Sequence, residues 1–323
     1  MKDWKKIFEI ETEADFERIA LEVFSFQYKN CVIYRKYVDL LDRKSPTCIE
    51  EIPFLPIEFF KSQEVLSVPK SGKETLFLSS GTGIIGRSKH LVSNVSIYEA
   101  SFCNAYKLLF GIPKEQVILA LLPNYLEQGN SSLVYMVSAL IESSKNELSG
   151  FLLNEFEEIK KRYEAAIHSG KEVVIFGVSY ALLDLAEQKM DFSQAKIIET
   201  GGMKGRRKEL TKVELHKVLV EGLGVDFVSS EYGMTELLSQ AYSLKNGVFV
   251  CPPWMKVLFR DVYDPLTLIS GEKSGGINVI DLANINSCSF VQTQDLGRKT
   301  REGFVIEGRI DLADIRGCNL MVS

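Results

Sequence analysis

Hydrophobic and polar positions alternate along this chain in two different patterns. Apolar residues recur at helical spacing through residues 13–42, which predicts a helical entry, and the proline-rich segment 52–56 predicts extended chain. Beyond it, short apolar runs alternate with amphipathic segments. The runs predict strands at 74–79, 116–122, 172–176, 195–199 and 226–229, and the amphipathic segments predict helices at about 94–110, 130–144, 155–169, 179–189 and 208–222. Such alternation is typical of βαβ units, in which helices cover a largely parallel sheet.

The pattern changes after residue 248. Four short apolar runs, separated by Gly, Pro and Asn turns, predict strands at 257–262, 276–281, 289–293 and 304–307. We therefore expect an α/β protein with parallel-rich sheets covered by helices and a smaller, mostly antiparallel β-subdomain. The predicted division is 1–247 for an α/β core with a helical N-terminal entry, and 248–323 for the β-rich subdomain.

Composition narrows the class of protein. The chain has 323 residues, a formal net charge of −5 and no dense Lys/Arg stripe, so nucleic acid is a poor match as a principal partner. Six widely spaced cysteines and three histidines predict neither a disulfide framework nor a zinc site. No run of about 18 apolar residues occurs and no secretory leader is visible. We expect a soluble, cytoplasmic protein with reduced thiols and no integral membrane association.

A Ser/Thr/Gly loop follows the predicted strand at 74–79. Glycines let the backbone approach an anion closely, and hydroxyl and main-chain N–H groups can donate to phosphate oxygens. The residues concerned are Ser79, Ser80, Gly81, Thr82 and Gly83. A tight turn that leaves a strand would explain the same glycines without a ligand. Residues 81–88 also match the P-loop spacing, but Arg87 replaces its lysine, and this change is not conservative.

Three further segments suit a nucleotide. In residues 229–236, an aromatic ring beside a glycine can stack on a purine, while Thr235 and Glu236 suit a phosphate oxygen and Mg²⁺. The alternative for Glu236 is an acid at a helix N-terminus. A glycine turn at 200–205 would let a base lie against bare backbone, and Asp295, at a strand end, can accept both ribose hydroxyls. Among the histidines, His168 and His216 are expected on solvated helix faces.

The order of these segments resembles the adenylate-forming, acyl-CoA synthetase-like superfamily. The Ser/Thr/Gly loop, the YGxTE element at 232–236, the Asp-x-Gly at 295–297 and the GRxD at 308–311 follow the order of its motifs across residues 76–318. A narrower resemblance, to the LuxE-type acyl-protein synthetases, rests on residues 52–57, 60–61, 121–126, 200–205 and 316–318.

The resemblance implies roles for particular residues. It implies that the ATP phosphate loop is formed by Ser79, Ser80, Gly81, Thr82 and Gly83. It also implies that the adenine and acyl pocket is bordered by Gly201, Gly202, Glu231, Tyr232 and Gly233. Thr235 and Glu236 would serve phosphate and Mg²⁺, Asp295 would hold the ribose hydroxyls, and Arg309 would assist Asp295. Two departures stand out. The loop has Thr-Gly-Ile-Ile-Gly where the family favours Thr-Thr-Gly, and the chain ends soon after Cys318, so the mobile C-terminal domain with its catalytic lysine is expected to be absent.

The implied activity is an ATP- and Mg²⁺-dependent ligase reaction. A fatty acid would become acyl-AMP, and the acyl group would pass to Cys318 and on to a partner such as an acyl reductase. A thiolate suits this step because it is strongly nucleophilic and yields a thioester that remains reactive. Two alternatives remain open: a ligase that uses coenzyme A or a carrier thiol, with Cys318 structural, and a non-catalytic subunit of a fatty-acid reductase complex.

Overall fold

The computed structural model describes residues 4–80, 86–123, 129–201 and 210–310. Contacts divide the chain into two units, and each is considered by itself. Unit 1 comprises Met1–Thr75, Gly83–Asn94 and Val250–Ser323, and unit 2 comprises Leu76–Thr82 and Val95–Phe249. The chain passes between them near two short strands, β2 (Thr75–Leu78) and β3 (Lys89–Val92).

Unit 2 is built on a sheet with the strand order β5-β4-β6-β7-β8-β9. The pairs are parallel except β8 with β9. The strands are β4 (Gln116–Leu121), β5 (Gly150–Phe151), β6 (Glu172–Val178), β7 (Ala195–Thr200), β8 (Ser229–Tyr232) and β9 (Ala241–Ser243). Strand β4 is buried throughout, and β6 at every position after its first, because helices cover both faces of the sheet.

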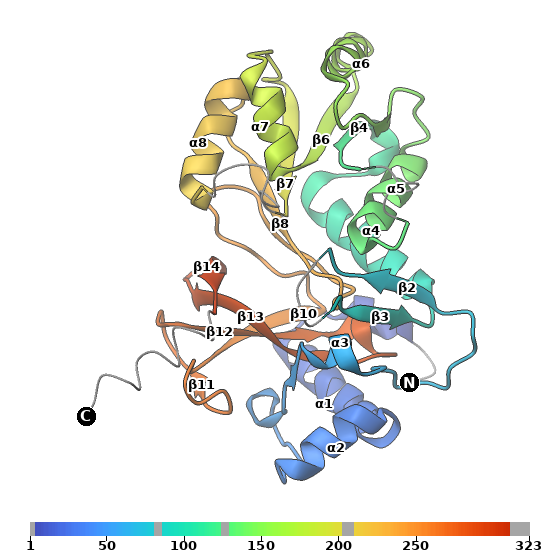
Figure 1. Cartoon of the computed structure of the whole chain (residues 1–323), viewed down its shortest axis with the longest axis vertical. Helices are drawn as coiled ribbons and strands as arrows, with labels where there is room; N and C mark the ends of the chain where they lie inside the picture. The colour runs from blue at the N-terminus through green and yellow to red at the C-terminus, as the bar shows by residue number, and fades with distance from the viewer. Residues whose placement is uncertain (1–3, 81–85, 124–128, 202–209, 311–323) are drawn as a thin grey trace. The chain divides into compact units, whose positions relative to one another are not determined.

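Five helices accompany this sheet: α4 (Val95–Phe110), α5 (Ser132–Ser144), α6 (Phe156–His168), α7 (Ser179–Glu187) and α8 (Lys212–Leu223). In Figure 1, α7 and α8 lie along one face of the sheet, and α4 and α5 along the other. A capping box between Thr211 and Glu214 starts α8, and Gly224, with φ +71°, ends it in the left-handed conformation that glycine adopts readily.

Unit 1 contains a mostly antiparallel sheet in the order β1-β13-β12-β10-β11, with β14 paired to β13. Its strands are β1 (Leu55–Pro56), β10 (Met255–Arg260), β11 (Leu268–Ile269), β12 (Ser274–Asp281), β13 (Phe290–Lys299) and β14 (Phe304–Arg309). Its helices are α1 (Glu13–Asn30), α2 (Val32–Leu40) and α3 (Phe59–Ser62), with 3₁₀ turns at Trp4–Glu9, Ile49–Glu51 and Leu282–Asn284. A further 3₁₀ turn, Pro113–Glu115, precedes β4 in unit 2.

A buried glutamine fastens α1 to the loop before β13. The Gln27 side-chain amide donates to the main-chain carbonyls of Asn284 and Ile285, at 3.1 and 2.9 Å, and its oxygen accepts the N–H of Ser289 at 2.9 Å. All three partners are main-chain groups that need a hydrogen bond when they are buried. Gln27 therefore supplies hydrogen bonds to main-chain groups in the segment before β13, where they have no partner in a neighbouring strand.

The α/β pattern followed by a β-rich region is confirmed, with three corrections to the details. The helical entry is two helices, because Cys31 is extended (φ −86°, ψ 106°) between α1 and α2. The predicted strand at 226–229 instead begins at Ser229, and the strand predicted at 289–293 extends to Lys299. Strand β13 is longer than predicted because polar residues continue it beyond its apolar run, whereas the apolar pair Phe227 and Val228 precedes β8 without being part of it. Contacts also group residues 1–75 with the β-rich region. The predicted division into 1–247 and 248–323 groups them differently, and that division stays a prediction.

Candidate active site

The carboxyl ends of β6, β7 and β8 share one edge of the parallel sheet in unit 2. Ser179 follows β6, Thr200 and Gly201 end β7, and Glu231 lies near the end of β8. Gly201 has φ +70°, so the chain turns there in a conformation that side chains disfavour. In open α/β sheets this edge is where ligands bind. The predicted glycine turn and the predicted YGxTE element are therefore neighbours.

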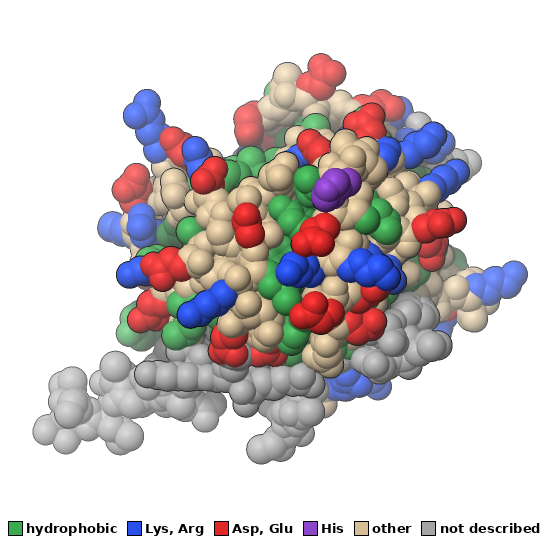
Figure 2. Space-filling view, turned by 90° about the horizontal axis from the view of Figure 1, so that it is seen from above, with side chains coloured by type: hydrophobic (Ala, Val, Ile, Leu, Met, Phe, Trp, Pro, Cys, Tyr) green, Lys and Arg blue, Asp and Glu red, His purple; other side chains and the backbone are tan. Residues whose placement is uncertain are grey.

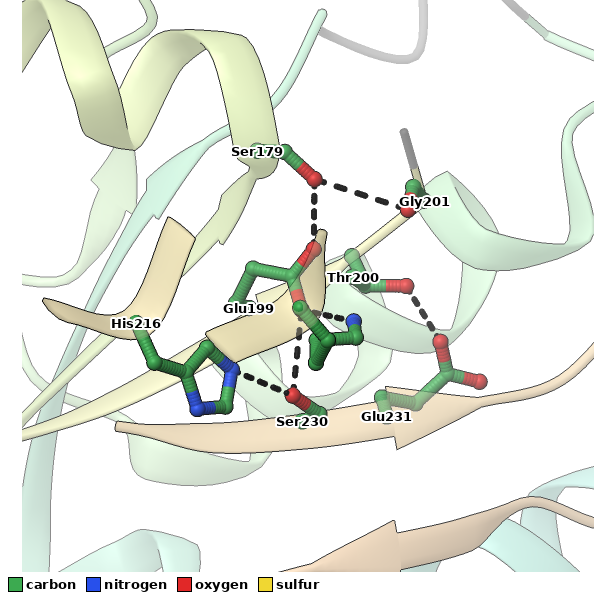
Figure 3. Close-up of polar contacts among 8 residues, drawn as sticks. Ser179, Glu199, Thr200, Gly201, His216, Ser230 and Glu231 are labelled. Atoms are coloured by element: carbon green, nitrogen blue, oxygen red, sulfur yellow. Dashed lines mark hydrogen bonds and ion pairs between the residues drawn. The ribbon is translucent and has the colours of Figure 1, made fainter. Parts of the chain in front are cut away.

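A buried carboxylate, Glu199 of β7, joins three elements behind this edge (Figure 3). Its Oε1 accepts the Ser179 hydroxyl at 2.5 Å, and its Oε2 accepts from Lys212 Nζ at 2.6 Å and Ser230 Oγ at 3.1 Å. Glu199 itself is fully buried. We call Ser179, Glu199, Lys212, His216 and Ser230 the Glu199 cluster. Hydrogen bonds and one cation thus compensate the burial of its charge.

The hydrogen bonds of this cluster define the tautomer of His216. Ser230 has one hydroxyl hydrogen, which it donates to Glu199, so its oxygen accepts from His216 Nε2 at 2.9 Å. The pKa of His216 is lowered by burial, so the neutral ring carries its proton on Nε2. The prediction that His216 lies on a solvated helix face is therefore wrong, whereas His168 does lie exposed on α6.

A second contact lies on the opposite face of the same strands. The Thr200 hydroxyl donates to Glu231 Oε2. Burial raises the pKa of Glu231 from 4.5 to about 7, and the Thr200 hydrogen bond opposes the rise. A side chain at Gly233 would collide with Glu231 Oε1, so glycine is required there for this carboxyl to keep its place. The site therefore contains a carboxyl group that changes protonation near neutral pH.

The rest of the YGxTE element lies in a turn after β8. Tyr232 is buried and packs edge-on against Phe249, with ring centroids 6.1 Å apart. Glu236 is also buried, and Thr235 is partly exposed. No helix begins within residues 231–240, so the alternative that treated Glu236 as a helix N-terminal acid is wrong.

The predicted ribose contact lies in unit 1. Asp295 of β13 and Arg309 of β14 are register partners, and Arg309 Nε lies 3.7 Å from Asp295 Oδ1. The same guanidinium donates to Gln294 Oε1 at 3.1 Å. The structure therefore brings together the two residues that the sequence paired, and most of the Arg309 side chain remains exposed.

The other predicted residues are described in part. Ser79 is partly buried and Ser80 is exposed, and the Leu78 N–H just before them donates to the Asn130 carbonyl at 2.8 Å. Gly81, Thr82, Gly83, Gly202 and Cys318 lie outside the described residues. Within the described ranges, no group of three or more His, Cys, Asp or Glu side chains is placed to hold a metal ion.

A surface depression of about 510 Å³ lies elsewhere in unit 2. It is lined by residues at and after the end of α7 and by residues from the second half of α8 and its C-terminal turn: Ala186, Glu187, Lys189, Met190, Asp191, Val218, Glu221, Gly222 and Gly224. Helices in βαβ units run antiparallel to the strands, so these helix ends lie at the amino edge of the sheet, away from Glu231. Figure 2 views the end of the molecule where α6, α7 and α8 lie in Figure 1, and it shows acidic and basic side chains intermixed without a broad patch of one sign.

Sequence reasoning missed the Glu199 cluster. The only signal was an acid directly after two isoleucines in a buried run, just before the Thr-Gly-Gly turn. The other members of the cluster are the first residue of α7, two residues of α8 and a serine of β8, and their positions in the sequence do not connect them with Glu199.

Solved structures of similar architecture define the class of this fold. ATP-bound MatB from Rhodopseudomonas palustris matches with a TM-score of 0.55 and 16% identity over 72% of this chain, which spans about half (47%) of that one. A 2-hydroxyisobutyryl-CoA ligase in its postadenylation state matches with a TM-score of 0.64 and 10% identity, over 93% of this chain and 68% of that one. A long-chain-fatty-acid-CoA ligase from Archaeoglobus fulgidus matches with a TM-score of 0.54 and 15% identity, over 76% and 53%. The fold is that of the adenylate-forming ligases.

The family can be stated more closely. Residues 6–323 match the family described as acyl-protein synthetase, LuxE, and the chain belongs to that family. It is also 24% identical, over 95% of its length and 86% of the relative, to the long-chain-fatty-acid–luciferin-component ligase of Vibrio harveyi. The predicted fold class, family and enzyme class are confirmed. In the part of the chain that the structure describes, no helix has the length and apolar character needed to cross a bilayer.

Proposed function

We propose that this enzyme activates a fatty acid with ATP, forms acyl-AMP, and passes the acyl group through Cys318 to a partner reductase. The family match over residues 6–323 carries the proposal. The Vibrio harveyi relative is named for a long-chain fatty acid, which supports that substrate class.

The site residues take their roles from the order of the motifs and from their placement. Thr200, Gly201 and Glu231 meet at the carboxyl edge of the sheet, which suits a wall of the adenine and acyl pocket. Asp295 is placed beside Arg309, so a carboxylate that accepts the ribose hydroxyls would have a cation to support it. Residues 79–83 would hold the phosphates through hydroxyl and main-chain N–H donors.

Glu236 would hold Mg²⁺ together with the ATP phosphates. Mg²⁺ is commonly bound by one or two carboxylates plus substrate phosphate oxygens and water, so a single buried carboxylate fits this role without a complete protein cage. When bound, the ion would neutralise charge on the phosphates. Thr235 would donate its hydroxyl to a phosphate oxygen.

The reaction proceeds in two bond exchanges. A carboxylate oxygen of the fatty acid attacks the α-phosphorus of ATP, the bond from that phosphorus to the bridging oxygen breaks, and pyrophosphate leaves. The Cys318 thiolate then attacks the acyl carbonyl carbon, and AMP leaves with the electrons of the broken carbon–oxygen bond. The product is a thioester on the enzyme, from which a second nucleophile on the partner takes the acyl group.

The described cysteines support the choice of Cys318, because each is a poor source of thiolate. Loss of hydration is the largest cause of a raised pKa in each of the five described thiols: Cys31, Cys48, Cys103, Cys251 and Cys288. Since the thiolate is the nucleophile, a raised pKa disfavours each of them as the acyl acceptor at neutral pH.

The test separates adenylation from acyl transfer. Purified enzyme with ATP, Mg²⁺ and radiolabelled fatty acid should exchange pyrophosphate into ATP and take up hydroxylamine-labile label. Cys318→Ser should keep exchange and lose labelling, whereas the matched control Cys103→Ser should keep both. Addition of an acyl reductase should then remove label from the wild-type enzyme. Label that persists undiminished in Cys318→Ser would contradict the role of Cys318.

A second candidate is a ligase that transfers the acyl group directly to coenzyme A. Two of the structural neighbours are named as CoA ligases, which motivates it. AMP release that depends on coenzyme A and is unchanged in Cys318→Ser would select this function over the first.

A further inference from the structure

We propose that Glu199 is a positioning residue for the adenylation reaction proposed above: its buried carboxylate joins Ser179, Ser230 and Lys212, and so holds the ends of β6, β7 and β8 in the arrangement that brings Thr200 and Glu231 together. The inference rests on the proposed function for its kinetic test, and a second readout is independent of activity.

The partners of Glu199 come from three different elements. Ser179 is the first residue of α7, Ser230 belongs to β8, and Lys212 is the first residue of α8. Both carboxylate oxygens are therefore occupied by donors that arrive along separate paths. Glu199 is buried, whereas 36% of the Lys212 side chain is exposed. Burying a carboxylate costs free energy that an ion pair of this kind returns only in part, so stability alone does not account for a charge at this position. Fixing the relative placement of these elements is the role that the contacts support.

The pairing of β7 with β8 links the position of Glu199 to the positions of Thr200 and Glu231. Glu199 and Ser230 are register partners of the parallel pair β7–β8, and their side chains meet on the face where α8 packs. Successive residues of a strand face opposite sides, so Thr200 and Glu231 meet on the other face (Figure 3). A shift of β8 against β7 that breaks the Glu199–Ser230 bond would also displace Glu231. The cluster and the site are two sides of one strand pair.

The turn at Gly201 is tied to the same carboxylate. Ser179 Oγ, which donates to Glu199 at 2.5 Å, lies 3.5 Å from the carbonyl oxygen of Gly201. Loss of the carboxylate would free this hydroxyl to turn toward the carbonyl. The effect would appear at the first glycine of the predicted Thr-Gly-Gly turn.

Glu199 also acts on Glu231 through its charge. Two charged groups on the other side of the strand pair act on Glu231 electrostatically: Glu199 of β7 raises its pKa, and Lys212 of α8 lowers it. Tyr242, its register partner on β9, is neutral because burial raises its own pKa well above the usual value. Replacing Glu199 by a neutral residue removes the negative neighbour and leaves the positive one. The pKa of Glu231 should therefore fall.

The experiment compares Glu199→Gln with Glu172→Gln. Glu172 is a matched control because it also pairs with a lysine across β6 and β7, Lys196 at 2.9 Å, but at the amino edge of the sheet. In Glu199→Gln we expect kcat for ATP–pyrophosphate exchange to fall by at least about 10-fold, because misplacement of site groups by about 1 Å can cost about 100-fold. The pH profile should move to lower pH. Glu172→Gln should match the wild type in both.

The independent readout is the titration of Glu231, followed by NMR of ¹³C-carboxyl-labelled glutamate. Its resonance is assigned by its disappearance in Glu231→Gln, and its midpoint should move to lower pH in Glu199→Gln. Ser179→Ala, which keeps the charge, provides a folded variant if Glu199→Gln is unstable: kcat should fall while the titration stays in place.

The outcomes separate this inference from the proposed function. If the wild-type enzyme exchanges no pyrophosphate with any fatty acid, the proposed function fails, while the NMR titration still tests Glu199. A Glu199 that only stabilised the fold would lower the melting temperature, while kcat for exchange in the folded Glu199→Gln enzyme would stay at the wild-type value. An unmoved titration, or undiminished exchange in an active Glu199→Gln enzyme, would overturn the inference.

Discussion

The half-buried carboxyl of Glu231 makes the stability of this protein depend on pH in a direction opposite to that of most acids. Its pKa is raised from 4.5 to about 7, so between these values the native state holds a proton that the unfolded state has released. The stability associated with that proton is fully present below pH 4.5, falls as the pH rises, and is lost above about 7. One pKa unit corresponds to about 1.4 kcal/mol, so the loss amounts to about 3 kcal/mol at most.

Glu231→Gln should remove this pH dependence. The neutral amide has nearly the same shape and can still accept the Thr200 hydroxyl, while it carries no charge to be buried. Below pH 4.5 the variant and the wild type should have similar free energies of unfolding. At pH 8 the variant should be more stable by up to about 3 kcal/mol, because only the wild type then carries a buried carboxylate.

Urea denaturation followed by tryptophan fluorescence at half-unit intervals from pH 4.5 to 8.5 measures this difference. Glu172→Gln is the control of opposite sign. The hydrogen bond from Lys196 lowers the pKa of Glu172, so its stabilising contribution is present above the ordinary value and is lost as the pH falls. That variant should lose stability at neutral pH. Parallel curves for Glu231→Gln and the wild type across the whole range would refute the reasoning.

Two further predictions concern packing. In Gly222→Ala, the new Cβ would lie 2.6 Å from Ala186 Cβ and 2.9 Å from the Ala186 carbonyl oxygen. Crowding between α8 and α7 should therefore outweigh the gain in helix propensity and lower the melting temperature, and a rise in the melting temperature would contradict this. Gln27→Leu should lower the free energy of unfolding in urea by about 2–4 kcal/mol, because it leaves the Ile285 carbonyl and the Ser289 N–H buried without the partners that Gln27 supplies, while the Asn284 carbonyl keeps the Ser287 N–H. A loss below about 1 kcal/mol would show that water replaces the amide.

The order of the motifs predicted which motif residues lie near one another better than it predicted the side chains that hold them in place. Asp295 and Arg309 could be paired in advance because both belong to motifs of fixed order, and the structure places them as register partners. Glu231 was predicted to border the pocket for the same reason, and that role stays a prediction. The contact between Glu231 and Thr200 could not be predicted, because this contact depends on the register of two strands that are about 30 residues apart in the chain.

His216 shows why the sequence prediction failed at one point. It lies on an amphipathic helix among charged residues, a pattern that usually indicates exposure to solvent. Its ring instead reaches Ser230 of β8, because α8 packs its first turns over the end of the sheet. Which side of a short helix is buried depends on its partner, and the partner is not adjacent in sequence.

The sequence by itself determined the alternation of strands and helices, the change to a β-rich region, the order of the motifs, and through that order the family. These features depend on local periodicity and on residues close together in the chain. Only the tertiary structure decided that one buried carboxylate, Glu199 of β7, joins β8, α7 and α8, and that burial raises the pKa of Glu231 to about 7. Both depend on burial and on contacts between distant segments, which arise only once the sheet has formed.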